Sequence, residues 1–114
     1  MSEHLIDRAT FDGLKDSVGA DFIAEIVRTF SDEVPALLDQ LHQALRKGDA
    51  ETFRRAAHSI KSNAAALGAL SLSASARELE FAARENRLNE IGSRLEVLDD
   101  AVCHVLEELK GMCV

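Results

Sequence analysis

The sequence predicts an all-α fold, an antiparallel four-helix bundle with a short additional helix at the N-terminus. Apolar residues recur along nearly the whole chain at the spacing of one helix face. Ala, Leu, Glu and Arg are abundant, and proline occurs once, at Pro35, which favours helices. Four of the apolar stripes are long, and short connections separate them, as is typical of helix bundles.

The first two predicted helices are bounded by capping residues. A short helix begins after Asp7 as its N-cap and ends at Gly19. Its apolar face carries Phe11, Leu14 and Val18. Asp21 is expected to cap the second helix, and Gly48 to end it. The second face carries Ile23, Ile26, Val27, Phe30, Val34, Leu37, Leu38, Leu41 and Leu45. Its register continues across Pro35, which predicts one long kinked helix.

Three further helices are predicted in the second half of the chain. Asp49 caps the third, and Gly68 follows its C-terminus. Its apolar face carries Phe53, Ala56, Ala57, Ile60, Ala64 and Leu67. Ser71 opens the fourth, and residues 85–89 end it. Its apolar face carries Leu72, Ala76, Leu79 and Ala83. The fifth carries Ile91, Leu95, Leu98, Val102, Val105, Leu106 and Leu109.

Size and charge restrict the possible functions. A chain of 114 residues suits one domain, expected over 1–114 with its core at about 8–110. The net charge of -7 and the absence of Trp and Tyr argue against nucleic-acid binding. No apolar run approaches the roughly 18 residues of a membrane span, and the polar N-terminus lacks a signal-peptide core. We expect a cytoplasmic monomer that binds neither membranes nor nucleic acid, and the Met1 start favours a free-standing protein.

The two cysteines are expected to be free thiols. Cys103 and Cys113 fall ten residues apart on the last predicted helix. On a straight helix this spacing is about 15 Å, which is too long for a disulfide between them. Free thiols indicate a reducing compartment.

The stretch AAHSIKSNAAALGA, residues 56–69, contains the principal candidate site. With Ile60 facing the core, His58 lies about 160° away around the helix. His58 is therefore predicted to be exposed to solvent, with Lys61 and Ser62 one turn along beside it.

Basic residues surround this histidine. Between residues 53 and 70 the charged residues are Arg54, Arg55 and Lys61, and none is acidic. Two of these cations lie within one turn of His58 and favour its neutral form, with a lone pair free to attack. The imidazole would then be a nucleophile for a phosphoryl group, and Lys61 would balance the charge on the phosphoryl oxygens.

The surface beyond His58 is predicted to be flat, because Ser62, Ala65 and Ala66 have little bulk. A wide partner could then bring its own active site to the imidazole. The residues expected to contact such a partner are Arg54, Arg55, Ser62, Ala65 and Gly68.

These residues resemble the signature of the histidine-containing phosphotransfer (HPt) domain. That signature is a His, a Lys three residues later, then Gly or Ser, and small residues up to a Gly ten after the His. Here these are His58, Lys61, Ser62 and Gly68. The flanks GDAETFRRAAH and LSLSASARELE agree as well. The resemblance covers nearly the whole chain, from about Thr10 to Leu109.

The resemblance implies a phosphorelay intermediate in two-component signalling. His58 would accept a phosphoryl group from an aspartyl phosphate on one receiver domain and pass it to an Asp on another. The partners would be receiver domains of response regulators and of a hybrid sensor kinase. The chain would need no cofactor of its own, since the receivers bring the Mg²⁺.

Two positions depart from the common family pattern. Ser62 stands where many members have Gly, and this difference could narrow the choice of partner. Glu80 stands where members often have Gln, on the helix that follows the His. A carboxylate there would repel a phosphoryl group unless it is paired, for example with Arg77 or Arg84.

Other functions have weaker support in the sequence. Asp39-x-x-His42 is the only fragment of a di-iron motif, so no metal site is expected. The chain has no glycine-rich phosphate loop, and we expect no ATP-dependent kinase activity. The alternative is a helical adaptor that docks receivers or other regulators without being phosphorylated. A plain structural bundle is a third interpretation.

Overall fold

The computed structural model describes residues 6–112. Within this range all regular structure is helical and no strand occurs, which confirms the all-α prediction. The elements are α1 (Arg8–Val18), α2 (Ala20–Lys47), α3 (Ala50–Ala66), α4 (Leu70–Arg84), the short 3-10 helix η1 (Leu88–Glu90) and α5 (Arg94–Met112).

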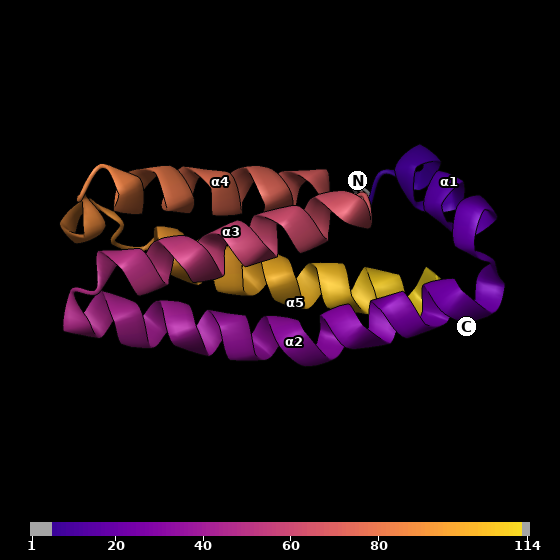
Figure 1. The fold of residues 1–114 in the computed structure, drawn as a ribbon, viewed down its shortest axis with the longest axis horizontal. Helices are drawn as coiled ribbons and strands as arrows, with labels where there is room; N and C mark the ends of the chain where they lie inside the picture. The colour runs from indigo at the N-terminus through magenta and orange to yellow at the C-terminus, as the bar shows by residue number, and fades with distance from the viewer. Residues whose placement is uncertain (1–5, 113–114) are drawn as a thin grey trace.

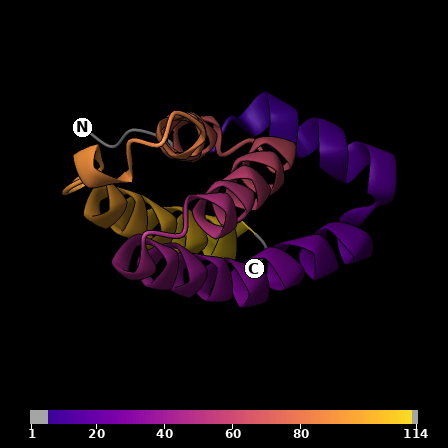
Figure 2. The same cartoon turned by 60° about the vertical axis from the view of Figure 1, so that its left-hand side comes forward.

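The four long helices lie side by side, and successive ones run in opposite directions along the chain (Figure 1). The most extensive packing joins α3 to α4, α2 packs on α3, and α5 contacts both α4 and α2. α1 turns away from this group and lies at the end where α3 meets α4, as the rotated view also shows (Figure 2). Each long helix therefore has two neighbours against which to bury its apolar face.

The core consists mainly of the predicted apolar faces, and it also includes Ile6, Ala44, Ala69 and Ala82, which were not predicted. The largest fully buried side chains include Leu41, Phe53, Ile60, Leu98 and Leu109. Ile26, Leu37, Leu38, Leu45 and Leu106, at the margins of the predicted stripes, are only partly buried and pack against this core.

Alanines are prominent on the buried faces of α3 and α4. Ala57 and Ala64 on α3 and Ala76 on α4 have no solvent exposure. Small side chains allow two helices to approach closely. The two helices are also joined by a hydrogen bond of 2.9 Å from Ser73 Oγ to the carbonyl oxygen of Lys61.

Side-chain caps begin two of the helices where they were predicted. The carboxylate of Asp7 accepts from the amide of Thr10, and that of Asp49 accepts from the amide of Thr52. The prediction for Asp21 is wrong, since α2 already begins after Gly19 and Asp21 lies in its first turn. A carboxylate in the first turn still interacts favourably with the helix dipole.

α2 continues through Pro35 as a single helix. Pro35 is exposed whereas its neighbour Val34 is fully buried, so the missing backbone hydrogen bond falls on the solvent side. Water can satisfy the freed carbonyl oxygen there, and packing of the buried face keeps the helix intact. The predicted single long helix is confirmed.

The boundaries of the last two helices differ slightly from the prediction. α4 begins at Leu70, one residue before Ser71. Ile91 is buried as expected, but it lies in the connection after η1 and not on α5, which begins at Arg94. A buried apolar residue in a loop is difficult to distinguish by periodicity from the first turn of the helix that follows.

Two further findings concern membrane spans and the cysteines. Among the described helices, none combines the length and the apolar character that a membrane span requires. Cys103 is exposed and free, while Cys113 lies outside the described residues.

Ile6 and Asp7, the two described residues before α1, form hydrogen bonds to distant parts of the chain. The amide of Asp7 donates to the carbonyl oxygen of Gly68 at 2.7 Å. Ile6 is buried, and its amide donates to Glu108 Oε2 on α5 at 2.9 Å. Gly68 has a φ of +87°, and a Cβ there would stand 2.8 Å from the carbonyl oxygen of Asp7.

Replacement of Gly68 by Ala should therefore destabilise the fold. The left-handed backbone and the contact with the Asp7 backbone together predict a loss of about 1–3 kcal/mol in the free energy of unfolding. The measurement is urea denaturation. Gly13→Ala is the matched control, because Gly13 lies inside α1 with open space around it, and its replacement should be neutral or stabilising. Equal effects of the two substitutions would contradict this account of Gly68.

Candidate functional site

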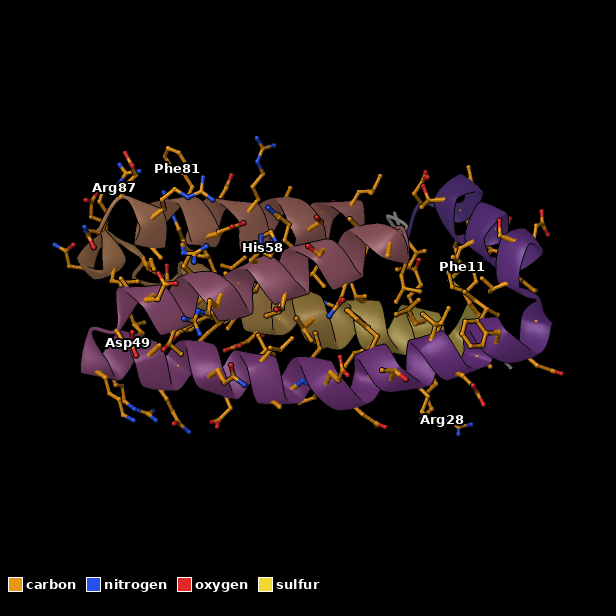
Figure 3. All side chains as sticks on the ribbon, viewed as in Figure 1. Phe11, Arg28, Asp49, His58, Phe81 and Arg87 are labelled. Atoms are coloured by element: carbon orange, nitrogen blue, oxygen red, sulfur yellow. The ribbon has the colours of Figure 1, made fainter. Side chains whose placement is uncertain are left out.

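His58 lies near the middle of α3 on the side that faces α4 (Figure 3). Its side chain is 53% exposed, whereas Ile60 on the other side of the helix has no exposure. The predicted orientation is confirmed. The imidazole is open to solvent although its helix packs against two others.

Glu80 on α4 connects the charged groups around this histidine. One carboxylate oxygen, Oε2, lies 3.0 Å from His58 Nδ1 and 3.3 Å from Arg84 Nη2. The other, Oε1, lies 2.8 Å from Lys61 Nζ. Glu80 is only 3% exposed, and it is the one charged residue that is buried within residues 6–112. Two residues of α3 and one of α4 thus converge on a single carboxylate.

The environment of Glu80 keeps it ionised. Burial raises the pKa of this carboxyl group, but the contacts with Lys61 and His58 lower it by more, so that its pKa lies below the ordinary 4.5. The negative charge is matched by Lys61 and Arg84.

The ionised carboxylate also determines how the imidazole is presented. A carboxylate accepts hydrogen bonds and cannot donate them, so Nδ1 of His58 must be the donor in this contact. In the neutral ring the lone pair is then on Nε2, and this nitrogen has no hydrogen-bond partner within residues 6–112. The site therefore presents an oriented, accessible nucleophile with an ammonium group nearby.

The arginines before His58 are less available than the sequence suggests. Arg54 Nη2 lies 2.7 Å from Glu51 Oε1, and Arg55 Nε lies 3.3 Å from the same oxygen. Glu51 lies just before residues 53–70, the stretch around His58 that contains no acidic residue. The carboxylate of Glu80, expected on the next helix near His58, contacts the imidazole directly and offsets the cations around it.

The small residues after His58 are divided between surface and core. Ser62 and Ala66 are exposed, and Ala65 is half-buried, so a low surface does follow the histidine. Gly68 is buried against the backbone of Asp7. Its predicted contact with a partner is wrong, because Asp7 and Thr10 already cover it.

Comparison with known families finds a match over most of the chain. The model of the Hpt domain matches residues 25–110. The chain belongs to the Hpt domain family. The match spans α3 and α4 and therefore includes His58, Lys61 and Glu80.

A solved structure supports the same conclusion for this Hpt domain. The structure is similar to that of histidine-containing phosphotransfer protein B (HptB) from Pseudomonas aeruginosa PAO1, with a TM-score of 0.91 and 28% sequence identity. The similarity covers 98% of this chain and 96% of that one. A comparison with curated proteins gives no match. The chain is a histidine phosphotransfer protein of phosphorelays.

The contact between Lys61 and Glu80 was not anticipated from the sequence of this Hpt domain. A signal for it exists, because Glu80 falls four residues after Ala76 and three before Ala83 on the apolar face of α4. A charged residue in such a position is buried and needs a partner of opposite charge. Of the two partners suggested for Glu80, Arg84 is confirmed as one.

No metal cluster is present in the described part of this Hpt domain. Within residues 6–112, no three His, Cys, Asp or Glu side chains are grouped so that they could hold a metal ion. His42 of the Asp39-x-x-His42 fragment is partly buried and joins α2 to α5 through a contact of 2.7 Å between its Nε2 and Asp99 Oδ2.

Glu80→Gln should destabilise the domain in a way that depends on pH. Loss of the charged contacts predicts a decrease of about 1–3 kcal/mol in the free energy of unfolding at pH 7. The folded pKa of Glu80 lies below its unfolded value of 4.5. The stabilisation is therefore present above that pH and is lost as the pH falls through the lower folded value.

Urea denaturation of the wild type and of Glu80→Gln at several pH values between 7 and 3 tests this. The difference in stability should shrink on acidification. Glu78→Gln is the control, because Glu78 is exposed on the same helix and forms no ion pair within residues 6–112. A difference for Glu80→Gln that stays constant down to the lowest pH would show that its charge is not what stabilises the site.

Proposed function

We propose that His58 is the phosphoacceptor of this phosphotransfer protein. The observation that carries the proposal is the contact between Nδ1 and the buried Glu80, which leaves the lone pair of the neutral ring on Nε2 of a side chain that is 53% exposed. The lone pair would attack the phosphorus of an aspartyl phosphate. The N–P bond forms while the P–O bond to the aspartate breaks, and the electron pair returns to the donor's carboxylate. Transfer to a second aspartate follows the same path in reverse.

Lys61 is proposed to balance the negative charge of the phosphoryl group. Its ammonium lies on the same helix face as His58, and its side chain is 28% exposed. A phosphoryl group on Nε2 would bring negative charge close to Glu80, which repels it. Lys61 and Arg84 would compensate the carboxylate, and Lys61 would also contact the phosphoryl oxygens.

The partners in this proposal are receiver domains of response regulators and of a hybrid sensor kinase. They would supply the Mg²⁺ that stabilises charge during transfer, and this chain would contribute no cofactor. Helices α2 to α5 would work as a monomeric antiparallel four-helix bundle that presents His58 in the cytoplasm. The domain would not phosphorylate itself from ATP.

The surface that meets the receiver is proposed to extend from His58 over α3 towards α2. Ser62 and Ala65 have little bulk, and beyond them a hollow of about 240 Å³ lies between the two helices. Phe22, which is 52% exposed, contributes to the wall of this hollow. An exposed aromatic residue beside a low surface is typical of the apolar centre of a protein interface.

The first test is phosphotransfer itself. The protein is mixed with a phosphorylated receiver domain and Mg²⁺, beside the His58→Gln variant. We expect label on the wild type only, labile in acid and stable in base, as is expected of a phosphohistidine. His104→Gln is the matched control, since His104 is exposed on α5 and should leave the labelling unchanged.

The adaptor interpretation predicts a different result. An adaptor would bind receivers without becoming labelled, and His58→Gln would leave binding and downstream output intact. That result would contradict the role of His58 as phosphoacceptor.

Lys61→Ala should slow phosphotransfer by about tenfold or more, with a smaller effect on receiver binding. The substitution removes an ammonium and leaves the Glu80 carboxylate close to the phosphoryl group. The double variant Lys61→Ala/Glu80→Gln should therefore recover part of the lost rate. Single-turnover kinetics and equilibrium binding separate the two effects. Equal losses of rate and binding would reassign Lys61 to docking.

A further inference from the structure

A cleft rich in arginine lies beside the phosphotransfer site. It has a volume of about 600 Å³ and runs along α4 to the beginning of α5. Its cations are Lys61, Arg77, Arg84, Arg87 and Arg94. We refer to this feature as the arginine cleft. Its lining also includes Glu80, so that one end of the cleft is formed by the residues that contact His58.

The arginine cleft carries an excess of positive charge on an acidic protein. Its lining has five cations and two carboxylates, Glu78 and Glu80, whereas the chain as a whole has a net charge of -7. Lys61 and Arg84 are paired with Glu80. The other three arginines are exposed and form no ion pair within residues 6–112. Their charges are available to a ligand.

An aromatic residue lies among these arginines. Phe81 is 51% exposed, and the guanidinium carbon of Arg87 lies 5.8 Å from the centre of its ring. Phe81 stands on the outer side of α4, and Arg87 stands beside it in the connection that follows α4 (Figure 3). Aromatic residues and arginine are enriched in protein interfaces and among the residues that dominate their binding energy.

We propose that the arginine cleft recognises a carboxylate-rich surface on the protein that exchanges the phosphoryl group with His58. This proposal rests on the function proposed above. A partner that reaches Nε2 of His58 must cover Lys61, and Lys61 belongs to the lining of the cleft. Acidic groups beside the partner's active site would then face the free arginines, while Phe81 would pack against an apolar part of the partner.

Complementary charge of this kind acts mainly on encounter and on partner choice. Opposite charges steer association, whereas a partner with a basic surface at the same place is repelled. The cleft would therefore select among receivers. The low surface on α3 by itself would admit many of them to His58. The contribution should weaken as salt screens the exposed charges.

The test compares two variants with the same change in net charge. Arg77→Glu/Arg87→Glu reverses the cleft, and Arg28→Glu/Arg46→Glu reverses two exposed arginines on α2. Arg28 points away on the opposite side of the molecule (Figure 3). Binding of an unphosphorylated receiver is measured by calorimetry at low and high salt, and phosphotransfer is measured separately. Circular dichroism verifies that each variant is folded.

We expect the cleft variant to bind the receiver at least about tenfold more weakly than the α2 variant at low salt, with the difference reduced at high salt. Equal binding by the two variants overturns the proposal. The binding measurement does not require phosphorylation, so a receiver that binds but leaves His58 unlabelled would contradict the proposed function alone.

A small anion is the other possible occupant of the cleft. Inorganic tripolyphosphate is therefore titrated into the wild type and the cleft variant. Tight binding to the wild type only, together with unchanged receiver binding in the cleft variant, would assign the cleft to a small anion and overturn the proposal. Weak binding of tripolyphosphate to both, with the receiver defect present, supports it.

Discussion

The site depends on one buried carboxylate. Glu80 is held at the interface of α3 and α4, where it is nearly inaccessible to solvent, and its charge persists only because cations from both helices surround it. An isolated carboxylate in that position would be costly to ionise. The same contacts that keep it charged also orient the imidazole of His58. Stability and presentation of the nucleophile are thus properties of a single cluster of side chains.

The cluster in turn requires that α3 and α4 lie close together in a definite register. Buried alanines on both helices permit the close approach, and the hydrogen bond from Ser73 to the Lys61 carbonyl oxygen joins the helices at the site. A larger residue in place of Ala57 or Ala76 would separate the helices and displace Glu80 from the imidazole. The run of small residues near His58 is therefore used on both sides of α3. It leaves a low surface outside and allows tight packing inside.

Much of the fold follows from local patterns that need no knowledge of neighbours. The apolar stripes, the caps at Asp7 and Asp49 and the glycine after α2 all act within one helix or one turn. Likewise, the exposure of His58 follows from its angle to Ile60. Apart from small shifts of helix boundaries, the differences from the prediction arose where distant segments meet. Gly68 is covered by Asp7 and Thr10, and Lys61 is directed to a carboxylate on another helix. Periodicity along a single helix does not determine such contacts.

The hydrogen bonds of Ile6 and Asp7 to distant parts of the chain have a consequence for the order of folding. Neighbouring helices of the bundle are joined by short turns, so their contacts link residues that are close in sequence and form quickly. The bond from Ile6 to Glu108 instead spans 102 positions of the chain. Its formation must close almost the whole chain into a loop, which has a large entropic cost until the helices are assembled. Ile6 and Asp7 are thus expected to attach last, onto a bundle that already holds His58 and Glu80 together.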